Sequence, residues 1–81
     1  MGLSRSKKLT LDLVKSYLRE RRSYCFTYEE LRRFYVRSKW YNRLNWHTCE
    51  RNIRHLVSEG ILRRVVRSNG GRRTVLFCIK H

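Results

Sequence analysis

The residues of this sequence that are best suited to chemistry are arginines, and they gather in two segments. Arg51 and Arg54 lie in a polar stretch between Asn45 and Gly60, and further arginines flank an Asn-Gly-Gly turn at positions 67–73. A guanidinium group binds a phosphate or a guanine base edge through two parallel hydrogen bonds. Both segments are therefore suited to binding an anionic polymer.

The whole chain is strongly basic. Its 81 residues include 20 Lys and Arg against 6 Asp and Glu, which gives a net charge of +14, and Arg outnumbers Lys by 15 to 5. Such a charge on one small domain calls for an anionic partner. Nucleic acid is the leading candidate for that partner, and an anionic membrane surface is the second. The alternative is that the basic surface only keeps the protein soluble and binds no partner.

Several classes of protein are excluded by what the sequence lacks. The longest apolar run, Val75–Ile79, is far shorter than the roughly 20 residues of a membrane span, and no signal-peptide core follows Met1. We therefore expect no membrane partner. We expect the protein inside a cell, either in the cytoplasm or nucleoid of a prokaryote or in a virus-infected host. No phosphate-binding loop or zinc-protease motif is present.

Catalytic and metal sites are not expected either. The acidic residues fall at predicted helix ends or on charged faces, and no Ser, Cys or His stands beside an obvious base. Cys25, Cys49 and Cys78 lack the paired spacing of metal ligands, and no His lies at a ligand interval from them. We expect no enzyme, no metal, no cofactor and no evident small-molecule substrate.

The first half of the chain is predicted to be mainly helical. Residues 1–8 are predicted to form a basic arm ahead of a domain at 9–81, and Thr10 is the expected N-cap of a helix over 10–22. A short β-prone piece at 24–26 precedes Thr27 and Glu30, whose spacing predicts a capping box and a helix over 28–37. Asn45 is the expected cap of a helix over 46–59 that ends at Gly60.

The segment 37–44 between the second and third helices is predicted to be either a loop or a short turn of helix. Its Trp40 and Tyr41 are candidates for an exposed dimer patch. The other large aromatics lie at core spacing, and we expect them to be buried; these are Tyr17, Phe26, Phe34, Tyr35, Trp46 and Phe77.

After Gly60 apolar residues recur at every second position, as they do in a β-strand. This predicts strands over 61–67 and 72–80, joined by a turn over 68–71. Val75, Phe77 and Ile79 should face one side of the second strand, and Leu76 and Cys78 the other. Three helices with a C-terminal hairpin make a compact α+β domain.

This order of elements resembles the winged helix-turn-helix family. The residues that carry the resemblance are NWHTCERNIRHLVSEGIL, in which the Asn45 cap, Thr48-Cys49, Ile53, Leu56 and Gly60-Ile61 match the usual spacing of a recognition segment. The resemblance covers roughly residues 9–80. It departs at 37–44, where about eight residues stand in place of a tight turn.

The resemblance implies that the third helix enters the major groove of duplex DNA and that the hairpin tip contacts phosphates or the minor groove. Thr48, Arg51 and Arg54 would face the groove, with Asn52 pairing with adenine if exposed. The implied recognition residues are His47, Thr48, Glu50, Arg51, Asn52, Arg54 and His55. The implied wing residues are Arg67, Ser68, Asn69, Gly70, Gly71, Arg72 and Arg73. The implied backbone contacts are Arg5, Lys7, Lys8, Lys39 and Arg43.

We therefore expect a sequence-specific transcriptional regulator that binds double-stranded DNA as a homodimer. Its size and Arg bias resemble small regulators of archaea and their viruses. A winged-helix RNA binder, a protein-interaction module and a plain solvated helix face remain as alternatives. In the winged-helix sheet Cys25 and Cys78 would lie on neighbouring strands, so a cross-strand disulfide, an intermolecular one and free thiols all stay open.

Overall fold

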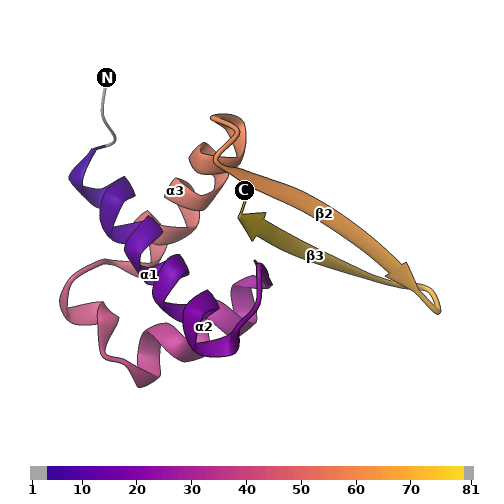
Figure 1. The fold of residues 1–81 in the computed structure, drawn as a ribbon, viewed down its shortest axis with the longest axis horizontal. Coiled ribbons are helices and arrows are strands. Elements are labelled where there is room, and N and C mark those ends of the chain that lie inside the picture. Colours follow the sequence, from indigo (N-terminus) through magenta and orange to yellow (C-terminus); the bar gives the residue numbers. More distant parts are fainter. Residues whose placement is uncertain (1–3, 80–81) are drawn as a thin grey trace.

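The computed structural model describes residues 4–79, which fold into helices followed by a projecting hairpin (Figure 1). In chain order the elements are α1 (Arg5–Arg21), β1 (Cys25–Phe26), α2 (Tyr28–Arg37), the 3-10 turn η1 (Trp40–Asn42), α3 (Trp46–Ser58), β2 (Leu62–Asn69) and β3 (Arg72–Ile79). The α+β class with three helices and a C-terminal hairpin is confirmed.

The first helix begins earlier than the sequence predicted. Ser4 is its N-cap, with a hydroxyl that accepts a hydrogen bond from the Lys7 amide at 3.3 Å. The prediction of an arm over residues 5–8 is therefore wrong, because these residues form the first turns of α1; residues 1–3 lie outside the described part. Thr10 is buried inside the helix, where its hydroxyl donates to the Ser6 carbonyl at 2.8 Å.

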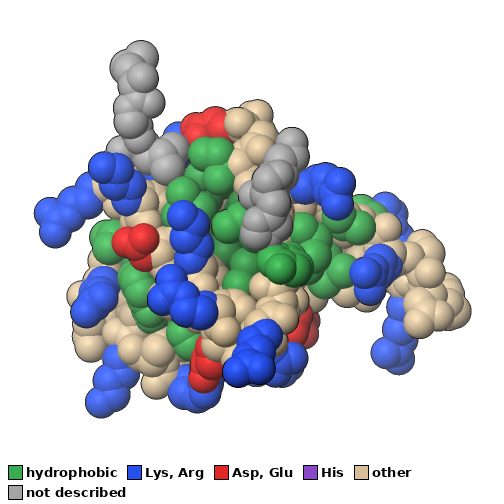
Figure 2. Space-filling view, viewed as in Figure 1, with side chains coloured by type: hydrophobic (Ala, Val, Ile, Leu, Met, Phe, Trp, Pro, Cys, Tyr) green, Lys and Arg blue, Asp and Glu red, His purple; other side chains and the backbone are tan. Residues whose placement is uncertain are grey.

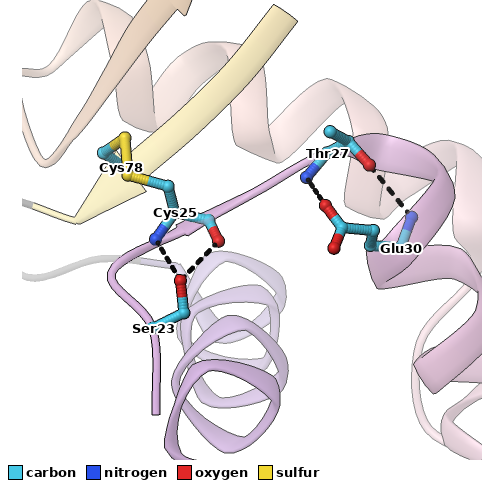
Figure 3. The surroundings of a disulfide bond; sticks show 5 residues. All are labelled: Ser23, Cys25, Thr27, Glu30 and Cys78. Carbon is cyan, nitrogen blue, oxygen red and sulfur yellow. Dashed lines mark hydrogen bonds between the residues drawn. A yellow bond between two sulfur atoms is a disulfide. The ribbon is translucent and has the colours of Figure 1, made fainter. Parts of the chain in front are cut away.

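The second and third helices lie where their caps predicted them. Thr27 and Glu30 form a capping box, in which each side chain accepts from the other residue's amide at 3.2 and 3.1 Å (Figure 3). Asn45 caps α3 by accepting from the His47 amide at 2.8 Å. The intervening segment contains the short helical turn η1, which was one of its two predicted forms.

The sheet has the strand order β1-β3-β2 and is antiparallel throughout. The register pairs Leu62 with Ile79, Arg64 with Phe77 and Val66 with Val75 on one face. The predicted alternation along β3 is thus confirmed. The predicted turn was too long, because Ser68 and Asn69 are the last residues of β2 and pair with Arg73 and Arg72.

The hydrophobic core lies among the helices and the base of the sheet. Of the aromatics expected in it, Tyr17, Phe26, Tyr35 and Phe77 are buried, while Phe34 and Trp46 are half-buried and pack against it. Cys49 is fully buried, as its core spacing predicted.

Within residues 4–79, no helix combines the length and apolar character of a membrane span.

A disulfide joins Cys25 of β1 to Cys78 of β3 (Figure 3). The two residues are directly opposed in the sheet and 53 positions apart in sequence. Ser23 braces the same strand, because its hydroxyl donates to the Cys25 carbonyl and accepts from the Cys25 amide. Among the three open alternatives for the cysteines, the structure has the cross-strand bond.

Candidate nucleic-acid interface

The buried side of α3 determines which of its residues reach solvent. Cys49, Ile53 and Leu56 are fully buried, and Asn52 is 4% exposed. Since a helix turns once in about 3.6 residues, the face opposite these four is centred on positions 47, 51, 54 and 58. This exposed face is the part of α3 that can contact a partner.

Two of the three residues expected to face a groove are fully on that surface. Arg51 and Arg54 are exposed, together with His47 and His55 at the two ends of the face. Thr48 and Glu50 are only half-buried and lie toward its margins. Ser58, which the sequence pattern did not single out, continues the same line by one more turn.

Asn52 does not belong to the exposed face, so the exposure on which its predicted contact with adenine depended is not met. Its amide donates a hydrogen bond of 3.2 Å to the hydroxyl of Thr10 across the interface between α3 and α1. The Thr10 hydroxyl in turn donates to the Ser6 carbonyl. A buried amide needs such a partner, so Asn52 serves to hold α3 on α1.

The long connection before α3 is packed rather than loose. The Tyr35 hydroxyl donates to the Leu44 carbonyl at 2.5 Å, and the Tyr35 ring lies 5.2 Å from that of Trp46. The guanidinium of Arg32 lies over Trp46 at 5.9 Å. These contacts fix the first turn of α3, and they bring Arg32 of α2 next to that turn.

Two of the expected backbone contacts lie in this connection. Lys39 is exposed and has a positive φ of 58°. Arg43 is exposed, and its guanidinium lies over the ring of Trp40 at 5.3 Å. The packing on Trp40 pre-orients the Arg43 side chain while leaving its charge at the surface.

The hairpin formed by β2 and β3 projects away from the helices (Figure 1). Gly70 and Gly71 form its two-residue turn with φ of 59° and 83°, a conformation that favours glycine at both positions. The seven expected wing residues are all exposed. Cross-strand pairing places Arg67 and Arg72 on one face and Arg73 on the other, so the tip has guanidinium groups on both faces.

The three basic residues near the start of α1 are separated by the fold. Lys7 is half-buried and forms an ion pair of 2.5 Å with Glu59, just beyond α3. Arg5 and Lys8 are exposed. Only these last two keep a charge free to meet a phosphate, because the ammonium of Lys7 is used to hold α1 against the end of α3.

Most Lys and Arg side chains of residues 4–79 form no ion pair with an acidic side chain of that range. Within the described part of the chain, ion pairs involve Lys7, Arg21 and Arg37, and none includes an arginine of α3 or the hairpin. Figure 2 shows Lys and Arg side chains spread over the helical body and along the hairpin, with fewer Asp and Glu between them. An anion near this surface meets uncompensated charge.

Tyr28, which the sequence analysis did not single out, lies beside an arginine of the exposed face of α3. It lies at the start of α2 and borders a hollow together with Arg54 and Arg64. Burial raises the pKa of its hydroxyl, while the neighbouring Arg54 opposes that shift. In the sequence it stood only as the first residue of the helix that follows the Thr27 cap.

Within residues 4–79, no cluster of His, Cys, Asp and Glu is arranged to hold a metal ion.

No protein-family model matches this chain, and no curated protein is similar to it. Among solved structures, the chain is similar to "Stf76 from the Sulfolobus islandicus plasmid-virus pSSVx", with a TM-score of 0.60 and 26% sequence identity. The match covers 98% of this chain and 84% of that one. This protein therefore shares its fold with a protein of an archaeal plasmid-virus.

Proposed function

We propose that this protein binds double-stranded DNA in a sequence-specific manner and acts as a small transcriptional regulator. The observation that carries the proposal is the exposed face of α3, where Arg51 and Arg54 have no acidic partner among the described residues. A helix whose guanidinium groups point outward can read guanine edges in the major groove.

The hairpin supplies the second half of the interface. Its exposed tip bears arginines on both faces, and Gly70 and Gly71 add no side chain that would keep a duplex away. Arginines at such a tip suit phosphates or a narrow minor groove. In this arrangement α3 specifies the sequence, and the hairpin with Arg5, Lys8, Lys39 and Arg43 positions the protein on the backbone.

We further propose that the protein acts as a homodimer on an inverted repeat. One small reading module contacts few base pairs, and two copies extend the recognised site. Tyr41 of η1 is 52% exposed and offers an aromatic ring to a second copy, whereas Trp40, the other residue expected in that patch, is half-buried and packs against the core. The site of action would be inside a cell, on a cellular or viral genome.

Selection from random duplex oligonucleotides tests the proposal directly. We expect an enriched motif, and an inverted repeat within it would support the dimer. Binding of the selected duplex should weaken with salt at a log–log slope near −0.9 per phosphate contacted. Competition with unlabelled duplex RNA and unlabelled duplex DNA distinguishes DNA binding from the RNA-binding alternative. No enriched motif together with stronger competition by RNA would overturn the proposal.

A further inference from the structure

A hollow of about 460 Å³ lies between α3 and the hairpin. Six residues from four elements line it: Tyr28 of α2, Arg54 and Val57 of α3, Arg64 of β2, and Val75 and Phe77 of β3. Its volume falls in the range of small-molecule sites, which are concave, mostly apolar and supplied with a few polar groups.

The floor and walls of the hollow are apolar. Phe77 is 3% exposed, and its ring centroid lies 4.7 Å from that of Tyr28 at a tilt of 59°. Val57 and Val75 are half-buried on the two sides. Two tilted aromatic rings flanked by branched aliphatic side chains favour a flat apolar group, because such a group fills the space and gains ring contacts.

The rim of the hollow is cationic. Arg54 and Arg64 are both exposed, and neither takes part in an ion pair among residues 4–79. The register fixes the side on which Arg64 lies, because it is opposed to Phe77 on the inner face of the sheet. The Tyr28 hydroxyl lies beside Arg54 and adds a group that can donate a hydrogen bond.

We propose that this hollow binds a small aromatic anion, with the ring against Tyr28 and Phe77 and the acidic group between Arg54 and Arg64. Contact with DNA phosphates would account for the two arginines but not for the apolar floor between them. Arg54 belongs to both surfaces, so the anion and DNA would exclude each other. This exclusion rests on the proposed function, whereas binding of the anion does not.

The probe for the test is anilinonaphthalenesulfonate, an aromatic sulfonate whose fluorescence rises in apolar surroundings. Added to the folded protein without DNA, it should bind saturably at one site per chain. The neutral analogue N-phenylnaphthylamine has the same rings without the sulfonate, and we expect it to bind about tenfold more weakly. Weak, non-saturating fluorescence or equal affinity for both probes would overturn the proposal.

Two neighbouring arginines give a matched pair of variants. Arg64→Gln removes a charge from the rim, and Arg63→Gln removes one from the opposite face of the sheet, where Arg63 is opposed to Cys78. Both reduce the net charge equally, so general electrostatic attraction changes by the same amount. We expect Arg64→Gln alone to weaken sulfonate binding about tenfold. An equal loss in both variants would contradict the site.

Competition with duplex DNA completes the test. The sulfonate should displace labelled duplex from the wild-type protein at concentrations that fill the hollow, and duplex should displace the sulfonate in return. Simultaneous binding of both would overturn the exclusion. If the protein binds the sulfonate at one site but binds no DNA at all, the proposed function fails while the anion site stands.

Discussion

Asn52 of α3 and Thr10 of α1 share a buried hydrogen bond of 3.2 Å at the interface of the two helices. Both side chains are almost or fully inaccessible to solvent. An apolar pair at these positions would leave the two helices free to shift along each other, whereas the hydrogen bond favours one alignment. The bond therefore helps to set the direction in which the arginines of α3 point.

A double-mutant cycle tests this relationship. Thr10→Val leaves the Asn52 amide buried without its partner and should cost about 1–3 kcal/mol of unfolding free energy, measured by urea denaturation. Asn52→Leu removes the other member of the pair. We expect the double variant to lose less stability than the sum of the single losses. Strictly additive losses would show that the two side chains act independently.

Arg51→Ala or Arg54→Ala should weaken binding to the selected duplex by roughly 1–3 kcal/mol and binding to random duplex by less. The reason is that a base contact distinguishes sequences, while a phosphate contact does not. Fluorescence anisotropy with both duplexes measures the difference. Arg19→Ala, on the exposed end of α1, is the charge-matched control. An equal loss on both duplexes would identify the residue as a backbone contact.

Arg72→Ala at the hairpin tip should instead weaken binding to all duplexes similarly. The log–log salt slope should fall by about 0.9, which corresponds to the loss of one phosphate contact. Arg72 is exposed beside the two-residue turn and is paired with Asn69, so its loss leaves the hairpin itself intact. Titrations at several salt concentrations give the slope. Loss of affinity restricted to one base position would mean that the tip reads sequence.

Reduction of the Cys25–Cys78 disulfide should destabilise the fold. A crosslink between residues 53 positions apart restricts the unfolded chain, which corresponds to roughly 4 kcal/mol in the chain-entropy model. We expect a lower melting temperature in the presence of reductant. In the variant with Cys25→Ser and Cys78→Ser, added reductant should have no further effect. An unchanged melting temperature on reduction of the wild-type protein would argue against a stabilising crosslink.

The fold should weaken in alkaline solution, partly through Cys49. Burial raises the pKa of its thiol from 9.0 to about 12. The unfolded chain releases this proton near the lower value and the folded chain near the higher one, so the stability that the neutral thiol confers is lost as pH rises through that window. Burial also raises the pKa of Tyr17, Tyr28 and Tyr35, which adds to the loss.

The measurement is the urea midpoint over a series of pH values. Cys49→Ala should show a shallower fall above pH 9 than the wild-type protein, because the variant lacks the buried thiol whose raised pKa contributes to the fall. Identical pH dependence in the two proteins would mean that the thiol is not shielded in the folded state. The same shielding predicts that thiol reagents modify Cys49 only after denaturation.

Local chemistry was sufficient to predict α2, α3 and the hairpin. The Thr27–Glu30 capping box and the Asn45 cap satisfy backbone amides within a few residues, so their effect does not depend on distant parts of the chain. The start of α1 was predicted wrongly, although its cap is also a local contact, from the Lys7 amide to the Ser4 hydroxyl. Thr10 is a residue type that caps helices, but tertiary burial against Asn52 keeps it inside one, and Ser4 provides the cap instead.

The basic charge, the order of the elements and the exposed positions of Arg51 and Arg54 follow from the amino-acid sequence, because charge and apolar periodicity are local properties. Tertiary packing, in contrast, buries Asn52, pairs Lys7 with Glu59 and brings Cys25 to Cys78. It also assembled the hollow around Tyr28 from four elements. Each of these four features depends on contacts between residues that are far apart in sequence. A local sequence pattern does not encode which distant residues come into contact.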